Sequence, residues 1–553
     1  MNFIDYTIVA GFFIFIFSIG SYFYKWVEEP DDFFVAGRQL TPFILAATIT
    51  VTNMYLYNFV GEAGQAYKEG ISIVWHEWTG NMALAFSGLF IIPIMRRLRI
   101  RTIPEVIEKR YNKVVRILVS IIWMVRFCGL LGIVLYLGGV VIGEVTGFHS
   151  YTFWILILAI ISVAYTFLGG MWSVTFTNTT QFILMLSGSL IVVPIIMSAV
   201  GWFPEMVKQL PDGHLNFIPS VGKFDWKFIL AIWLIGFEWA STDQGMLQMV
   251  FGAKNTKTVA KGLVLAGIIL TPFNLLMFFP GLAGRVLYPG INEVDAVIPI
   301  LYTNILPHIV LGFIVVGFIA SELSTISSNI NAIATLFTVD VYKSFLKSDA
   351  TKKQVLNVVR IMTIFAGISM IISAFFVKYY FQSAVDAWLF IMSFLDMPLF
   401  VVLIIYGFFW KRATWQGALF GYLGGALSGL IIFLVFDLKA GYDFATVTFS
   451  TIIASLIICP IVSLLTKPSP EGKIKEVWDA KKVSEEEIKS NEIFHIIPIS
   501  FWGRFCIGLI LLGLIMFVVS VIMGSMNIGN PSLIGISGMI IYFVGCFARL
   551  YFE

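Results

Sequence analysis

The sequence is 553 residues long, and 58% of its residues are hydrophobic while only 12% are charged. Soluble domains carry roughly 25% charged residues, so this chain has too little polar surface to remain dissolved in water. The composition therefore excludes a soluble protein and indicates a chain embedded in lipid. The net charge of +3 is small, and only its distribution along the chain is informative.

Apolar segments long enough to cross a bilayer occur along the whole chain. About 20 helical residues span the hydrocarbon core. By that criterion we expect fifteen segments, at residues 4–25, 43–64, 72–96, 115–145, 150–170, 177–199, 226–252, 262–287, 307–337, 356–378, 384–410, 414–436, 445–466, 500–524 and 531–550. The first is too long for a signal-peptide core and lacks a cleavage motif, so we expect it to be retained. The sequence predicts an all-α polytopic membrane protein with about 14–15 transmembrane helices.

Lys and Arg are concentrated in alternate loops, which follow the predicted segments 72–96, 226–252, 307–337, 384–410 and 445–466. Basic loops remain on the cytoplasmic side of a membrane. The pattern therefore predicts a protein of the cell inner (plasma) membrane with its N-terminus outside and its C-terminus in the cytoplasm. The last of these loops, residues 467–499, is rich in Lys and Glu and is expected to be a solvated cytoplasmic linker.

Several kinds of catalytic or cofactor site are not indicated. The sequence has no nucleotide-binding GxxxxGK[ST] loop, its five histidines are scattered, and its cysteines (Cys128, Cys459, Cys506 and Cys546) lack metal-site spacing. We expect no disulfide framework, no cysteine-bound zinc and no nucleic-acid partner. Because no nucleotide-binding loop is present, transport of a solute against its concentration gradient would have to be driven by an ion gradient.

Three polar clusters interrupt apolar segments, at residues 51–58, 236–245 and 320–331. Polar groups within a membrane are costly unless they line a site. In the third cluster Ser321, Ser324, Thr325 and Ser328 stand at i, i+3, i+4 and i+7 and so share one helix face. Their oxygens suit a dehydrated alkali cation, although small Ser residues also allow helices to approach closely.

The predicted segments 43–64 and 226–252 are five segments apart, and each is interrupted near its middle by polar residues or glycine. Corresponding broken helices indicate an inverted-repeat transporter with its site at the bilayer midplane. We therefore expect a five-plus-five core, with a first repeat at 43–199 and a second at 200–411. Residues 1–42, an N-terminal helix and loop, and residues 412–553 would be peripheral.

Six sequence stretches resemble the sodium:solute symporters, the family that includes the sodium/glucose cotransporters. They are EPDDFFVAGRQLTPF, IRTIPEVIEKRYN, GGMWSVTFTNTTQ, STDQGMLQMVFGAKNTKTVAKG, NAIATLFTVDVYK and GFFWKRATWQGALFG, and the resemblance extends from about residue 5 to residue 465. It implies the LeuT-type fold, alternating access and sodium-coupled symport rather than an enzyme.

The resemblance also implies a sodium site. Its ligands would be the backbone carbonyls of Val51 and Met54, the carbonyl of Ser321 and the hydroxyls of Ser324 and Thr325. Sodium would be the coupling ion, and these positions agree with the polar stripe.

A second ion site of some family members is weakened in this sequence. Asn178 occupies the position of an aspartate, while Ser327 and Ser328 match other parts of that site. Because a neutral amide lacks the counter-charge of a carboxylate, we expect one sodium ion per transport cycle.

The solute site departs from that of the galactose transporters. His76-Glu77-Trp78 keeps the glutamate, Asn53 is retained and Asn58 replaces a glutamine, and Glu238 and Trp239 are further candidates. However, Gly236 and Leu130 replace two asparagines. A standard hexose site is therefore not implied.

Arg126, Glu238, Glu322 and Asp396 place unusual charges inside the helical bundle. Each costs at least ~2.5–3.5 kcal/mol at a helix centre, which makes it a functional candidate. Arg126 could form a structural ion pair with one of these carboxylates, or it could bind the carboxylate of a solute. We favour the structural pair.

Transport is the function that these observations favour. A sensor would need an attached signalling domain, and the polar stretch 467–499 is too short to form one. A channel would need a continuous polar stripe along its pore helices, whereas the polar residues here are concentrated in three clusters within the apolar segments. We expect a sodium-coupled symporter for a small polar solute, with a sugar or polyol first and an acidic sugar (sialic acid or uronate), a zwitterionic amine or an amino acid as alternatives. Its partners would be the solute, sodium and the lipid bilayer, and the protein is expected to be monomeric.

Overall fold

The computed structural model describes residues 1–380, 391–437 and 444–552. Within those ranges, helices account for the regular structure apart from an isolated bridge between Leu40 and Ala253. Ten helices in the described ranges are long and apolar enough to cross a membrane. They include α1 (Phe3–Tyr22), α8 (Lys113–Thr146), α9 (Tyr151–Ala199), α13 (Thr256–Leu287), α15 (His308–Thr335), α16 (Lys352–Tyr380), α19 (Trp415–Ile432), α21 (Phe444–Leu465), α24 (Phe501–Met526) and α25 (Pro531–Arg549).

The fifteen predicted segments fall on helices wherever the chain is described, and residues 384–390 of one segment lie outside the described residues. Two of these segments, 150–170 and 177–199, lie in the single helix α9, which is divided by a non-helical residue, Gly170, with φ 51° and ψ −136°. A Cβ atom there would lie 2.7 Å from the carbonyl oxygen of Phe33, so both the conformation and the close approach require glycine.

The first predicted break is present. Helix α3 (Pro42–Thr52) is capped by Asn53, and the chain resumes as η3 (Tyr57–Glu62) and α4 (Ala63–Glu69), so that the two halves meet at 59°. This break frees carbonyl and amide groups from the helical hydrogen-bond pattern.

The second predicted break is also present. Helix α11 (Trp226–Thr242) is separated from α12 (Gln244–Phe251) by Asp243, which is extended. Its carboxylate accepts a hydrogen bond from Met246 N at 3.0 Å and so caps α12.

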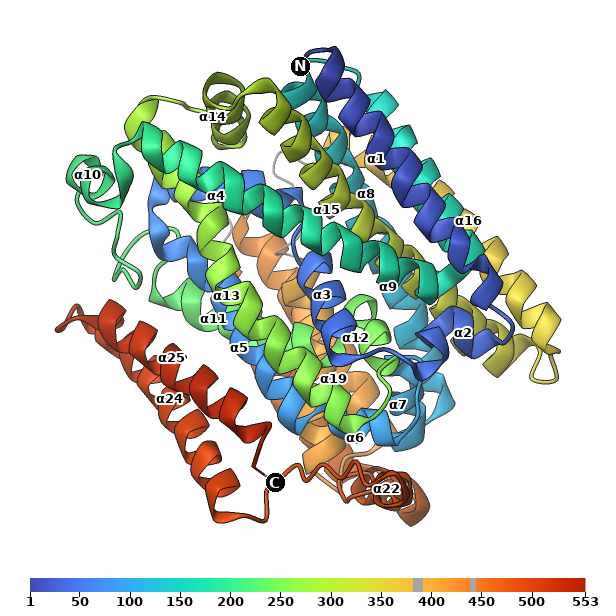
Figure 1. Ribbon diagram of the computed structural model, residues 1–553. Helices are drawn as coiled ribbons and strands as arrows, with labels where there is room; N and C mark the ends of the chain where they lie inside the picture. The colour runs from blue at the N-terminus through green and yellow to red at the C-terminus, as the bar shows by residue number, and fades with distance from the viewer. Residues whose placement is uncertain (381–390, 438–443, 553) are drawn as a thin grey trace.

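The long helices form one bundle (Figure 1), in which α5 (Trp75–Phe90) packs against α11 and α13, α9 against α15, and α8 against α16. Helices α24 and α25 pack side by side along one flank of the bundle, and the two termini lie at opposite ends of the view. The remaining elements are η1 (Phe23–Trp26), α2 (Pro30–Val35), η2 (Ala36–Arg38), η4 (Ile71–Val74), α6 (Ile92–Arg97), α7 (Ile103–Arg110), α10 (Trp202–Gln209), η5 (Val294–Ala296), α14 (Val297–Ile305), η6 (Leu336–Leu346), η7 (Met392–Asp396), α18 (Met397–Phe400), η8 (Val401–Phe408), η9 (Phe433–Asp437), α22 (Glu471–Asp479) and α23 (Glu485–Ser490).

Loops that the charge pattern places on one side of the membrane contact one another. Arg96 donates to the carbonyls of Ala253 and Lys254 at 3.0 and 2.8 Å, and Arg110 donates to the carbonyl of Ala413 at 3.1 Å. These contacts join the loops after three different predicted segments.

The stretch 467–499, which the sequence predicts to be a solvated linker, is mostly exposed or half-buried, but it also has structure of its own. It contains α22 and α23 and is bound to α6 by Arg97, whose Nε donates to Glu487 Oε2 at 2.8 Å and whose Nη1 donates to the carbonyl of Lys481 at 3.2 Å. Both side chains of the ion pair are buried, with exposures of 2% and 4%. The high content of Lys and Glu concealed this pairing because composition alone does not show which charges are compensated.

Candidate functional site

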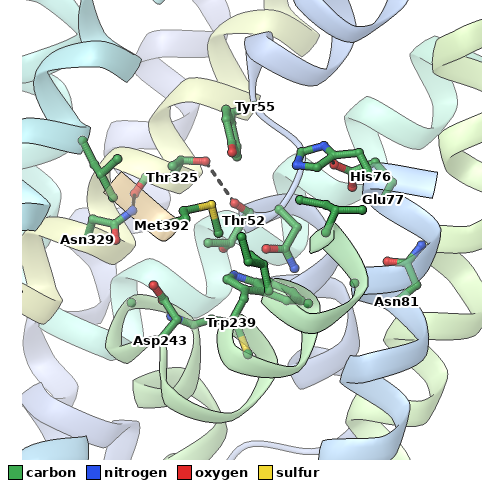
Figure 2. A pocket seen from close by; sticks show the side chains of 18 of the residues that line it. Thr52, Tyr55, His76, Glu77, Asn81, Trp239, Asp243, Thr325, Asn329 and Met392 are labelled. Atoms are coloured by element: carbon green, nitrogen blue, oxygen red, sulfur yellow. Dashed lines mark hydrogen bonds and ion pairs between the residues drawn. The ribbon is translucent and has the colours of Figure 1, made fainter. Parts of the chain in front are cut away.

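A cavity of about 100 Å³ lies where the two broken helices meet α5, α8 and α15 (Figure 2). Polar and aromatic side chains line it together, an arrangement typical of sites for small polar ligands. The lining residues are Thr52, Asn53, Tyr55, His76, Glu77, Gly80, Asn81, Arg126, Phe127, Leu130, Ile232, Ile235, Gly236, Trp239, Asp243, Gly245, Met246, Thr325, Asn329 and Met392.

Five of the eight predicted solute-binding residues line this cavity: Asn53, His76, Glu77, Arg126 and Trp239. Three do not. Trp78 donates through Nε1 to the carbonyl of Thr271 at 2.9 Å and stacks on Phe217, because its position on α5 faces α13 rather than the cavity. Glu238 is fully buried and accepts a hydrogen bond from Thr242 on its own helix at 2.6 Å.

Asn58 lies behind the cavity wall and positions Glu77. Its Nδ2 donates to Glu77 Oε1 at 2.8 Å, and Asn274 donates to Glu77 Oε2 at 3.3 Å. Asn81 in turn donates to Asn274 Oδ1 at 2.8 Å. The Glu77 carboxylate is therefore held as a fixed acceptor on the cavity wall. Sequence reasoning missed Asn81, although it stands one helical turn after Glu77 and so shares its face.

Arg126 is paired with two carboxylates. Its Nε donates to Asp396 Oδ2 at 2.9 Å and its Nη2 contacts the same oxygen, while Nη1 lies 3.1 Å from Asp243 Oδ2. Of the predicted partners, Asp396 contacts Arg126, whereas Glu238 and Glu322 have other hydrogen-bond partners. Asp243 is an unpredicted second partner. Asp243 could have been identified from the sequence because it lies in the polar cluster at residues 236–245, where the second break was predicted.

The five oxygens expected to bind sodium lie together at the break of α3. Ser324 Oγ lies within hydrogen-bond distance of the carbonyl oxygens of Val51 and Ser321, at 3.1 and 2.7 Å, and Thr325 Oγ1 lies 3.4 Å from the Ser321 carbonyl oxygen. Ser321 Oγ contacts the carbonyl of Met54. Each of these residues is at most 2% exposed. In this structure the hydroxyl groups donate hydrogen bonds to the carbonyl oxygens that the break exposes. A bound cation would instead be coordinated by both the carbonyl and the hydroxyl oxygens, and it would replace the hydroxyl protons in these contacts.

Two neighbours of this oxygen cluster were not predicted. The carbonyl of Thr52 accepts a hydrogen bond from Thr325 Oγ1 at 3.1 Å (Figure 2). The carboxylate of Glu322 accepts one from Leu56 N at 3.0 Å and so binds an amide that the break exposes. The sequence showed Glu322 as an intramembrane charge but offered it as a partner of Arg126. Its actual partner depends on where α3 ends, which no single side chain specifies.

The residues of the weakened second ion site lie beside this cluster. Asn178 Nδ2 donates to Thr52 Oγ1 at 3.0 Å and to Ser328 Oγ at 3.3 Å. Ser327 Oγ instead donates to the carbonyl of Ser324 on its own helix at 3.1 Å. The amide therefore directs hydrogen-bond donors toward the hydroxyls of Thr52 and Ser328.

A bundle with two broken helices around a polar cavity defines the class of the protein as a secondary transporter. Its residues 33–425 match the Sodium:solute symporter family, and the chain belongs to that family. This confirms the resemblance found in the sequence, and the protein is a sodium-coupled solute symporter rather than an enzyme, with multiple membrane passes.

The chain is similar to a sodium/glucose cotransporter of Vibrio parahaemolyticus, with 26% identity over 507 residues that cover 84% of this chain and 91% of that protein. It is 28% identical to the uncharacterized symporter YidK of Escherichia coli K12, over 69% of this chain and 70% of that protein. A solved structure of a Na⁺-coupled sialic acid symporter has a TM-score of 0.76 at 20% identity, over 85% of this chain and 99% of the other. The structure of Mhp1, a nucleobase-cation-symport-1 family transporter, gives 0.54 at 15% identity, over 81% and 98%. These likenesses confirm the LeuT-type fold.

Proposed function

We propose that this symporter carries a small neutral polyhydroxylated solute, a sugar or polyol, together with one sodium ion per cycle. The observation that carries the proposal is the cluster of five oxygens at the break of α3, directly beside a polar cavity. Oxygen ligands without a carboxylate suit a monovalent cation, while the Glu77 carboxylate and the Asn81 amide offer acceptors and donors for hydroxyl groups.

A neutral solute is favoured over an acidic one because of Arg126. Its guanidinium is the basic group that would bind a solute carboxylate, but Asp396 and Asp243 already compensate it. An acidic sugar would have to displace one of them and leave a buried carboxylate without a partner, which is costly. The relatives that are named for glucose and the structure named for sialic acid leave both classes open, and the paired state of Arg126 supports the neutral class.

Coupling between ion and solute would pass through residues that belong to both sites. Thr325 contributes a hydroxyl to the oxygen cluster and also lines the cavity, and Asn53 lies between Val51 and Met54 and lines it as well. A cation bound between the break of α3 and helix α15 would therefore fix the positions of residues that also line the solute cavity. Such a differential contact is what allows one ligand to raise the affinity for another.

The proposal also covers the orientation of the chain in the membrane and its oligomeric state. The contacts among the basic loops and the helices α22 and α23 support one common side for them, which the charge pattern assigns to the cytoplasm. The N-terminus would then be outside. We propose that the protein works as a monomer, because one chain supplies both the oxygen cluster and the polar cavity beside it.

The test is sodium-driven uptake of radiolabelled sugars and polyols into proteoliposomes. The Ser324→Ala/Thr325→Ala variant removes two of five cation ligands, and its uptake should lose the response to a sodium gradient. The matched control is Ser450→Ala/Thr451→Ala, an adjacent Ser–Thr pair on α21 whose hydroxyls donate to the Val447 carbonyl at 2.8 and 2.7 Å. It should respond like the wild type. Sodium dependence that persists undiminished in the first variant would refute this sodium site.

A further inference from the structure

Three side chains from η3 and α5, two elements that follow the first break, meet beside the cavity. Glu62 is the last residue of η3, while His76 and Glu77 stand in the first turn of α5. Glu62 Oε1 contacts His76 Nδ1, and Glu77 Oε1 lies 3.3 Å from the same nitrogen. One ligand atom from each residue lies within 4.8 Å of those of the other two. His76 Nδ1 therefore faces two carboxylate oxygens at once.

Among the residues that the structure describes, protein groups do not balance the charges of this cluster. Glu62 is 0% exposed, so its carboxylate has no access to bulk water. When both carboxyl groups are ionised, the imidazole leaves one negative charge uncompensated even if it is itself protonated. Asn58 also contacts both carboxylates, but it carries no charge. A divalent cation with a neutral imidazole would balance the two carboxylates.

The donor set and its surroundings fit a transition metal. One imidazole nitrogen and two carboxylate oxygens are the ligand types of open zinc sites, which keep a fourth position for water or another ligand. His76 and Glu77 line the cavity, so that fourth position would face it (Figure 2). Asn58 Nδ2 donates to Glu77 Oε1 at 2.8 Å and to Glu62 Oε2 at 3.3 Å. Such bonds orient metal ligands from behind.

We propose that Glu62, His76 and Glu77 form a binding site for a divalent transition-metal ion, with Zn²⁺ as the best fit. Sodium uses a different set of oxygens at the break of α3, so this is a separate site. A bound ion would occupy the wall of the solute cavity and withdraw Glu77 from hydrogen bonding with the solute. Zn²⁺ should therefore inhibit transport in competition with the solute.

The test measures Zn²⁺ binding by the purified full-length protein in competition with a chromophoric chelator, in sodium-containing buffer. The wild type should bind one equivalent. Glu62→Gln and His76→Gln each remove a ligand and should weaken binding by more than the about 10- to 100-fold that the loss of an outer partner causes. His149→Ala is the control, because His149 and Glu144 form an exposed pair at 3.5 Å outside the cavity, and it should bind like the wild type.

A second readout protects the test against variants that do not fold. X-ray absorption of the zinc-loaded wild type should show one imidazole nitrogen at about 2.0–2.1 Å, oxygen ligands at about 2.0–2.2 Å and no sulfur. A shell of water oxygens alone or with sulfur, or equal Zn²⁺ affinity in folded Glu62→Gln and wild type, overturns the proposal. These measurements involve no transport, so they stand or fall independently of the proposed solute.

Discussion

Arg126 joins three parts of the bundle through its side chain. It projects from α8, while Asp243 lies at the second break and Asp396 ends η7. A guanidinium keeps its proton in a protein, so within the membrane it requires a negative partner. Its faces also pack on Trp123 and Phe127, with the guanidinium carbon 4.8 and 4.9 Å from the ring centroids. Two carboxylates and two aromatic rings thus hold the residue in place, as expected for a structural role.

We predict that Arg126→Gln destabilises the protein by about 3–5 kcal/mol, the usual cost of breaking a buried ion pair, because Asp396 is left buried without its cation. The measurement is thermal unfolding of the purified protein. In Arg126→Gln/Asp396→Asn both charges are absent, so most of the lost stability should return. Binding of a neutral sugar by the folded variants should persist. A stable Arg126→Gln protein that has lost only solute binding would instead assign Arg126 to an acidic solute.

The residues at the cavity differ in how far sequence could predict them. His76 and Glu77 follow from the resemblance, and Arg126 follows from its charge in an apolar segment. Glu62 was missed because it matters only through its contact with His76, fourteen positions away on another element. Trp78 was expected to contact the solute, but it does not line the cavity although its neighbour Glu77 does, because adjacent helical positions face different directions. Whether Glu62 and Trp78 belong to the cavity depends on contacts between different helices, which the sequence alone does not show.

At the scale of whole elements, the sequence predicted more. The apolar lengths located the membrane helices, and the polar clusters located both breaks, because a polar run inside lipid is costly unless the chain opens there to form a site. The division of α9 at Gly170 was expected only as a loop between two segments. The docking of α23 was not expected at all. It depends on Ser484, which caps that helix and accepts from Glu487 N at 3.3 Å, and on a buried partner elsewhere in the chain.

We predict that Glu487→Ala releases the segment around α23 from α6, since Arg97 would lose its buried partner. Hydrogen exchange should rise across residues 484–494, where Arg97 also contacts the carbonyl of Phe494 at 2.5 Å. The control is Glu485→Ala on the same helix, whose pair with Lys489 spans 4.0 Å and is exposed, and such pairs contribute little. Equal exchange in the two variants would mean that the ion pair does not hold this segment.

The same contact should depend on pH. Burial opposes ionisation of Glu487, but hydrogen bonds from Arg97 and Ser484 outweigh it and hold the pKa of this carboxyl below its ordinary value. A depressed pKa means that the contact stabilises the docked segment at pH values above about 4.5 and loses that effect as the pH falls further. Exchange in residues 484–494 should therefore stay slow from neutral pH down to about 5 and accelerate in more acidic buffer, after correction for intrinsic rates. In Glu487→Ala this acceleration should be absent.

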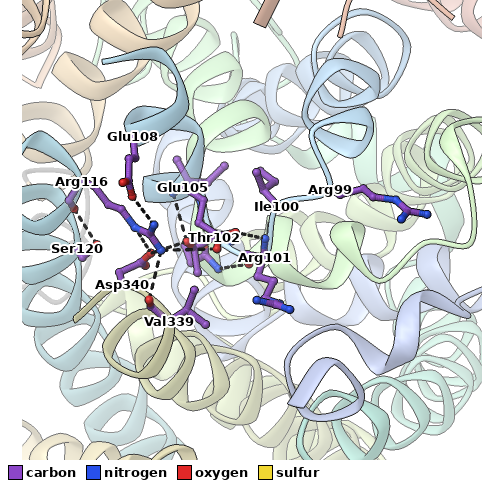
Figure 3. Close-up of polar contacts among 12 residues, drawn as sticks. Arg99, Ile100, Arg101, Thr102, Glu105, Glu108, Arg116, Ser120, Val339 and Asp340 are labelled. Carbon is purple, nitrogen blue, oxygen red and sulfur yellow. Dashed lines mark hydrogen bonds and ion pairs between the residues drawn. The ribbon is translucent and has the colours of Figure 1, made fainter. Parts of the chain in front are cut away.

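In the whole molecule, three of the stretches that carry the family resemblance meet in one place. Arg116 Nε donates to Asp340 Oδ1 at 2.7 Å, and Thr102 Oγ1 donates to the same oxygen at 2.9 Å (Figure 3). Gln244 accepts from Ile103 N at 2.7 Å, which adds the start of α12 to the junction. Stretches far apart in sequence therefore build one polar junction between α7, α8, α12 and η6.

The number of sodium ions per cycle is also a property of the whole molecule, and Asn178 determines our last prediction. The amide NH₂ group of Asn178 donates hydrogen bonds to the hydroxyls of Thr52 and Ser328. A second cation would need oxygen acceptors at this position, where the structure has N–H donors. Uptake by the wild type should therefore depend on sodium with a Hill coefficient near one. Asn178→Asp restores a carboxylate beside the same hydroxyls and should raise the coefficient and the charge moved per solute in electrophysiological recordings.

Ser328 provides the control for this change. In Asn178→Asp/Ser328→Ala the carboxylate is present but a hydroxyl partner is absent, so the gain should shrink. If the wild type already moved two charges per neutral solute, the amide oxygen of Asn178 would have to turn toward a second ion, since hydrogen-bonding amides can reverse within the same site. The single-ion prediction would then be wrong, while the site formed by Ser324 and Thr325 would be unaffected.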